Sequence, residues 1–146
     1  MTIYKQQSYT DPIIEINLKQ YLHNIHQIRK TLPHQTKLMI ILKANGYGLG
    51  AIPLAKSASD SNAVDYFGLA HLHEAIKLKE HGIQTPLLLL SETSQTDIPL
   101  ITQHHLTATV YTKSTIDALA HDAHIKNTRI RVHLKVNTGM NRFGIN

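Results

Sequence analysis

The fold of this chain is decided by residues 38–50, which read Leu-Met-Ile-Ile-Leu-Lys-Ala-Asn-Gly-Tyr-Gly-Leu-Gly. A short apolar run, typical of a buried strand, delivers Lys43 to the start of a glycine-rich turn. In parallel sheets the carboxyl ends of the strands carry the chemistry. An amine at that place can form an imine with a carbonyl compound or with pyridoxal phosphate. The backbone N–H groups of the turn could hold a phosphate.

The alternative interpretation of this stretch is a lysine that caps a strand as a solvated surface charge. The sequence has no G-x-x-x-x-G-K-[ST] motif, and no G-x-G-x-x-G follows the strand. Nucleotide binding is therefore not supported.

Apolar runs and helical repeats alternate along the whole chain. Predicted strands cover Lys37 to Leu42, Asp65 to Ala70, Leu87 to Leu90, Thr107 to Val110 and Arg129 to Val136. Predicted helices run from Asn17, as N-cap, to about residue 31, from Pro53 onward, from about His73 to Glu80 before Gly82, near Asp97 to Gln103, and from Ser114, as N-cap, to about His124. Strands joined by helices indicate a parallel sheet with right-handed connections. The first and third strands read as buried on both faces, which fits a barrel or a doubly wound sheet.

The last predicted strand alternates strictly between apolar and polar residues. One face carries Ile130, Val132, Leu134 and Val136, and the other carries Arg129, Arg131, His133 and Lys135. In a barrel the apolar face would pack on helices and the charges would point inward, toward an internal site. The alternative is an edge strand with one wet face. A complete (β/α)₈ barrel takes about 250 residues, so we expect 146 residues to form about the first half of such an α/β barrel.

Composition excludes several classes of function. The net charge of +5 is dispersed and lacks interleaved aromatic residues, so no nucleic acid partner is expected. No apolar run reaches the roughly 18 residues of a membrane span. The absence of cysteine and an N-terminus, residues 1–7, without a secretory pattern fit a cytoplasmic location. The histidine pairs His121/His124 and His71/His73 lack a third ligand at a recognisable spacing, so no metal site is expected.

Two long motifs resemble those of alanine racemases. Residues 42–50 resemble the pyridoxal-phosphate signature of that family, and residues 133–144, His-Leu-Lys-Val-Asn-Thr-Gly-Met-Asn-Arg-Phe-Gly, are similar to its downstream motif. Between them, Phe67-Gly68-Leu69-Ala70 and Glu74-Ala75 look like its second barrel strand and helix. The resemblance covers the chain from about residue 12.

The resemblance implies a fold-type III pyridoxal-phosphate enzyme that works as a homodimer. Such an enzyme interconverts L- and D-alanine by two-base proton transfer and supplies D-alanine for peptidoglycan. Residues 1–146 would form the N-terminal part of its barrel, and the β-rich C-terminal domain is absent. A racemase of another amino acid, a non-catalytic pyridoxal-phosphate-binding protein and a truncated remnant remain open as alternatives.

The resemblance also assigns roles to single residues. Lys43 matches the lysine that bonds to the cofactor and acts as a base on one face of the substrate. Tyr47 matches the tyrosine that hydrogen-bonds the cofactor phosphate, and Arg142 matches the arginine near the phenolic oxygen and the substrate carboxylate. Lys135 matches a lysine that is carbamylated in many members, whereas Asn137 replaces an often acidic residue. The second base, a tyrosine of the C-terminal domain, would lie beyond residue 146, so these residues alone should not racemise alanine.

Overall fold

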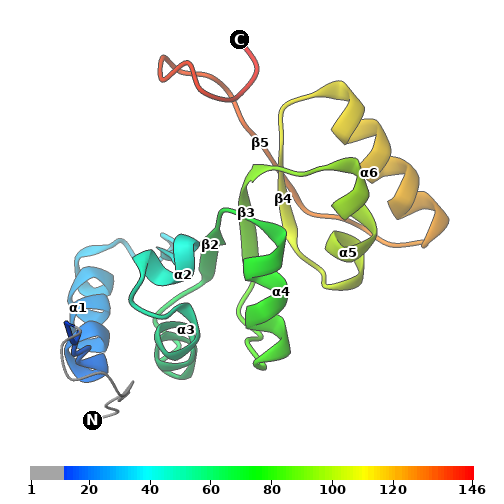
Figure 1. Ribbon diagram of the computed structural model, residues 1–146. Coiled ribbons are helices and arrows are strands. Elements are labelled where there is room, and N and C mark those ends of the chain that lie inside the picture. The colour runs from blue at the N-terminus through cyan, green and yellow to red at the C-terminus, as the bar shows by residue number, and fades with distance from the viewer. Residues whose placement is uncertain (1–11) are drawn as a thin grey trace.

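A computed structural model describes residues 12–146 as a parallel sheet whose strands are joined by helices (Figure 1). The sheet order is β1-β2-β3-β4-β5, and every neighbouring pair is parallel. The strands are β1 (Met39–Ile41), β2 (Tyr66–Leu69), β3 (Leu87–Glu92), β4 (Thr107–Val110) and β5 (Val132–Leu134). The helices are α1 (Leu18–Thr31), α2 (Lys43–Tyr47), α3 (Ala51–Asp60), α4 (Leu72–Glu80), η1 (Gln95–Asp97), α5 (Ile98–Gln103) and α6 (Lys113–Ile125). The predicted parallel α/β order is confirmed.

The helix ends follow local capping chemistry. Asn17 caps α1 as predicted, since its Oδ1 accepts the Gln20 N–H at 3.0 Å. The side chain of Gln20, three residues after the cap, donates to Asn24 and does not reach back to Asn17, so a capping box is only half formed. The N-cap of α6 is Thr112, and the prediction of Ser114 was wrong by two residues.

The core lies between the three central strands and the helices packed on them. Its largest fully buried side chains are Phe67, Leu42, Leu69, Leu78, Leu87, Leu89, Ile101, Leu106 and Val110. Every residue of β4 is buried, and so are the first three residues of β3. The central strands are therefore the most deeply buried part of the sheet.

The two outer strands differ from the sequence-based expectation. The residues of β1 are only half-buried, because β1 is an edge of the sheet. The last strand is shorter than predicted, and Val132 and Leu134 on its apolar face are 47% and 57% exposed. The predicted packing of that face on helices is wrong for the described residues, where only Ile130 of this series packs against the core.

The range 12–146 contains no helix that is long and apolar enough to cross a membrane. The prediction about residues 1–7 falls outside the described part of the chain.

Candidate active site

Lys43 lies where the sequence places it, at the carboxyl end of β1. The preceding residue, Leu42, is buried, and its N–H donates to the carbonyl of Gly68 in β2 at 2.8 Å. The side chain of Lys43 is half-buried, and its Nζ lies 5.9 Å from the ring centroid of Tyr47. The structure thus brings two of the predicted site residues together on one turn, α2.

The backbone of α2 is left-handed. Five consecutive residues have positive φ angles, namely Ala44 at 53°, Asn45 at 54°, Gly46 at 65°, Tyr47 at 56° and Gly48 at 85°. A side chain costs roughly 1–2 kcal/mol per residue in this conformation. Ala44 and Tyr47 therefore store about 2–4 kcal/mol of strain, whereas Asn45 tolerates this conformation better. Strain of this size persists only where surrounding contacts hold it, and it is typical of functional sites.

The N–H groups of this turn are used inside the protein. Gly46 N–H donates to Leu42 O at 2.8 Å, and Gly50 N–H donates to Asn45 O at 2.9 Å. The N–H groups of Ala44, Gly48, Leu49 and Ala51 also donate to protein oxygens. The prediction that the backbone of the turn holds a phosphate is wrong for these six amides. The Tyr47 side chain, 63% exposed, is the group that the turn presents outward.

Glu74 ties this turn to the neighbouring strand. Its Oε1 accepts the Ala44 N–H at 2.6 Å, and its Oε2 accepts the N–H groups of Ala70 at 2.8 Å and His71 at 3.0 Å. Burial alone would raise the pKa of Glu74, but the three N–H donors and the nearby His71 together lower it. In the sequence, Glu74 stands out only as part of the segment that resembles the second barrel strand and helix of a known family. Its position three residues after the helix N-cap was the available signal.

A second group of predicted residues lies at the end of β5. Lys135 Nζ donates to the carbonyl of Leu90 at 2.6 Å and lies 5.6 Å from the ring centroid of Phe143. The guanidinium carbon of Arg142 lies 5.5 Å from the same centroid. Lys135 and Arg142 therefore share one aromatic ring, as the loop after β5 folds back toward the sheet.

Asn137 and Gly144 hold that loop closed. Asn137 Oδ1 accepts the N–H groups of Gly139 at 3.2 Å and Asn141 at 3.0 Å, and its Nδ2 donates to Asn141 Oδ1 and Asn146 Oδ1 at 2.9 and 2.7 Å. A Cβ on Gly144 would lie 2.6 Å from the Asn137 nitrogen. Asn137 is thus the organiser of the loop that carries Arg142.

Glu92, at the end of β3, adds an acidic group that sequence reasoning missed. Its Oε1 accepts the hydroxyls of Thr112 at 2.7 Å and Thr115 at 3.2 Å. The hydrogen bond from Thr112, helped by Tyr111 and Thr115, lowers the pKa of Glu92 against the opposing effect of burial. Burial and the neighbouring Glu92 raise the pKa of Tyr111, which packs at 5.9 Å against Phe143.

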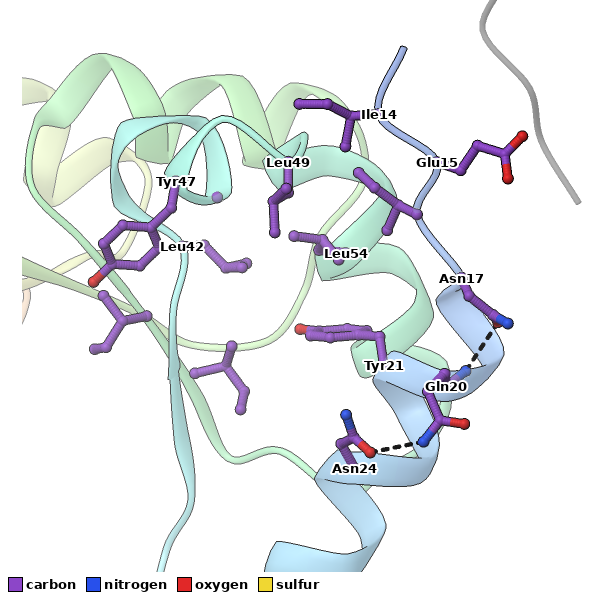
Figure 2. Close-up of a pocket in the computed structure, with 14 residues that line it drawn as sticks. Ile14, Glu15, Asn17, Gln20, Tyr21, Asn24, Leu42, Tyr47, Leu49 and Leu54 are labelled. Atoms are coloured by element: carbon purple, nitrogen blue, oxygen red, sulfur yellow. Dashed lines mark hydrogen bonds between the residues drawn. The ribbon is translucent and has the colours of Figure 1, made fainter. Parts of the chain in front are cut away.

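A cavity of about 450 Å³ opens beside the turn, between α1, β1 and α3 (Figure 2). Its lining is mainly apolar and includes Tyr47, Leu42 and Leu54, but not Lys43. The Tyr21 hydroxyl is buried and has no partner among the described residues, and burial raises the pKa of Tyr21 to about 12. The cavity adjoins the edge of β1 that has no neighbouring strand among residues 12–146, and its lining does not include the Lys43 amine.

The histidine pairs form no cluster of potential metal ligands. The rings of His71 and His73 stack with centroids 5.6 Å apart. Within residues 12–146 no group of three or more histidine, aspartate or glutamate side chains could hold a metal ion.

Comparison with known proteins gives consistent matches. A family model described as the N-terminal domain of alanine racemase matches residues 16–146. Alanine racemase 1 of Oceanobacillus iheyensis is 36% identical over 141 residues, which are 97% of this chain and 37% of that protein. The alanine racemase of Desulfovibrio desulfuricans is 40% identical over 131 residues, which are 90% of this chain and 35% of that protein.

Solved structures agree in fold. The alanine racemase of E. faecalis superposes with a TM-score of 0.83 at 40% identity, covering 89% of this chain and 35% of that one. A histidine racemase from Leuconostoc mesenteroides superposes with a TM-score of 0.76 at 30% identity, covering 88% of this chain and 34% of that one. The chain therefore spans little more than a third of the length of the relatives it matches.

Proposed function

The chain belongs to the alanine racemase family, and from this premise we propose that it is the lysine-bearing part of a pyridoxal-phosphate enzyme that interconverts L- and D-alanine. The observation that carries the proposal is the pairing of Lys43 and Tyr47 on one strained, internally bonded turn. The match over residues 16–146 supports the same assignment. In this proposal the enzyme is a cytoplasmic isomerase that works as a homodimer. It supplies D-alanine for peptidoglycan.

The donor set of the chain fits pyridoxal phosphate. Lys43 offers a half-buried amine that can bond to an aldehyde, and Tyr47 offers a hydroxyl to a phosphate. Arg142 offers a planar pair of donors to a phenolic oxygen or a carboxylate. When bound, pyridoxal phosphate supplies an electron sink that stabilises the charge left by removal of the α-proton.

Within this proposal each residue has a defined task. Lys43 Nζ holds the cofactor and moves a proton at one face of the substrate α-carbon. Arg142 orients the substrate carboxylate. Lys135 is the proposed carbamylation site: the change would place an anion beside Arg142, where two cations now share the Phe143 ring.

Racemisation needs acid–base groups on both faces of the α-carbon, and we assign only one of them to residues 1–146. The second base and a β-rich C-terminal domain are proposed to lie outside these residues. The 146-residue chain by itself should therefore not racemise alanine.

The test uses the protein translated from the complete reading frame that contains these residues. With pyridoxal phosphate and L-alanine it should form D-alanine, and borohydride followed by peptide mapping should find the cofactor on Lys43. Lys43→Ala should abolish both signals. Lys37→Ala is the matched control, because Lys37 lies before β1, at its opposite end, with its Nζ 5.6 Å from the Tyr66 ring centroid. Absence of racemisation, or its persistence in Lys43→Ala, would contradict the proposal.

A racemase of another amino acid is the second candidate. The likeness to a solved histidine racemase at 30% identity favours it. The same protein tested with L-histidine and L-alanine in parallel decides between the two, since the preferred substrate is the one with the larger kcat/KM.

A further inference from the structure

One carboxylate joins three backbone amides from two separate segments at the ends of β1 and β2. Glu74 Oε1 binds the N–H of Ala44, directly after Lys43, and Oε2 binds the N–H groups of Ala70 and His71. Bonds to an ionised acceptor are stronger than neutral ones. The end of β2 and the Lys43 turn are thereby fastened to the same side chain.

Capping of α4 accounts for only part of this arrangement. The capping interaction requires Glu74 to accept the His71 N–H, three residues earlier. The bond to Ala44 spans 30 positions and contributes nothing to the helix. It uses the second carboxylate oxygen, which a cap leaves free. A role directed at the Lys43 turn explains this bond, and a capping role does not.

The Ala44 amide is also the place where such a bond has the most effect. Ala44 is the first of the residues with positive φ, so the left-handed turn begins at the atom that Glu74 holds. The other end of the turn is held by Asn45, whose Oδ1 accepts the Ala51 N–H at 3.0 Å. With both ends fixed, the Lys43 and Tyr47 side chains leave the backbone in set directions.

We propose that Glu74 is a positioning residue, which holds the left-handed turn so that Lys43 and Tyr47 are presented together to the cofactor. This inference rests on the proposed function, because it names the residue that prepares the same site. In this proposal Glu74 contacts only backbone amides and neither substrate nor cofactor. Its effect passes through the Ala44 amide.

The test compares Glu74→Gln, Glu74→Asp and Glu80→Gln in the protein from the complete reading frame. Glutamine keeps the shape but replaces one acceptor oxygen by a donor group, and aspartate keeps the charge but shortens the reach. Glu80 lies exposed at the end of the same helix, so Glu80→Gln controls for the change of charge. Two readouts are recorded: hydrogen exchange of the Ala44 amide, and the pyridoxal phosphate concentration that gives half-maximal borohydride-fixed labelling of Lys43.

Both Glu74 variants should speed Ala44 exchange about tenfold and raise the half-labelling concentration about tenfold, the loss expected for one charge-assisted hydrogen bond. Glu80→Gln should match the wild type. If Glu74→Gln only lowers the thermal unfolding midpoint and leaves Lys43 labelling unchanged, the role is structural and the inference is wrong. If the wild type shows no Lys43 labelling, the proposed function is wrong. If Ala44 exchange is unchanged in Glu74→Gln, the inference that Glu74 holds the turn is wrong, whatever the labelling shows.

Discussion

Gly144→Ala should open the loop that carries Arg142. Gly144 has a φ of 117°, and an added Cβ would lie 2.6 Å from the Asn137 nitrogen and 2.8 Å from the Val136 carbonyl carbon. Contacts of a Cβ below 3.0 Å essentially do not occur. The two backbones must therefore separate by at least about 0.4 Å, and neither atom belongs to a flexible side chain that could turn aside.

The cost follows from what holds this point together. The Asn137 N–H donates to Ile145 O at 2.8 Å, and the Ile145 N–H donates to Lys135 O at 3.0 Å. Losing both bonds costs about 1–3 kcal/mol, at 0.5–1.5 kcal/mol each. The side chain at a positive φ adds roughly 1–3 kcal/mol of strain. The loop should thus lose about 2–6 kcal/mol of local stability.

Gly139→Ala separates these two contributions. Gly139 has nearly the same φ, 120°, but an added Cβ would meet no atom within 4 Å. Gly139→Ala should therefore reduce the stability of the loop only by the backbone strain of a side chain at a positive φ. The difference between the two variants, about 1–3 kcal/mol, corresponds to roughly fivefold to 150-fold faster hydrogen exchange of the Asn137 and Ile145 amides in Gly144→Ala. Equal exchange in both variants would refute the argument from the close contact.

Three further outcomes are expected. Asn137→Asp removes the amide that donates to two neighbouring asparagine oxygens, so exchange within residues 137–146 should rise by the equivalent of about 1 kcal/mol, and unchanged exchange would count against this role. The folded-state pKa of Glu74 is lowered, so its contribution is complete above the unfolded value of about 4.3 and is lost as pH falls through the folded value. Ala44 exchange should therefore increase in acid beyond its intrinsic pH dependence, and Glu74→Gln should remove that excess. Tyr47→Phe should weaken pyridoxal phosphate binding about tenfold in a titration, because one hydrogen bond to a charged phosphate is lost. The thermal unfolding midpoint should not change, because Tyr47 is 63% exposed. A lower midpoint in the melting experiment would indicate a structural role.

The sequence was sufficient wherever a local pattern settles the structure. The apolar run that ends at Leu42 placed Lys43 at a strand end, because a short apolar run followed by a glycine-rich turn favours a strand over a helix. Gly82, with a φ of 83°, ends α4 as predicted, since this conformation favours glycine. In both cases the residues that determine the outcome are neighbours in the chain.

Prediction failed where distant residues decide. The contact between Glu74 and Ala44 joins positions 30 residues apart and leaves no periodic signal. Thr112, Ser114 and Thr115 are all acceptable helix caps by residue type. The cap in the structure, Thr112, accepts the Thr115 N–H and also donates to Glu92, a contact between residues 20 positions apart. The burial of the outer strands depends on which elements cover them. The alternation of apolar and polar residues along a strand does not predict those elements.

The predicted site residues fall into two groups that are each fixed locally but lie on opposite edges of the sheet. Lys43 and Tyr47 are set by the turn after β1, and Lys135 and Arg142 are set by the loop after β5. Four strand spacings of about 4.8 Å separate the two edges by roughly 19 Å along the sheet. In a closed eight-stranded barrel the first and fifth strands face each other across an interior only wide enough for side chains and a small ligand. The geometry within each group is thus fixed by residues 12–146. The distance between the Lys43 amine and the Arg142 guanidinium would be set only by closure of the barrel.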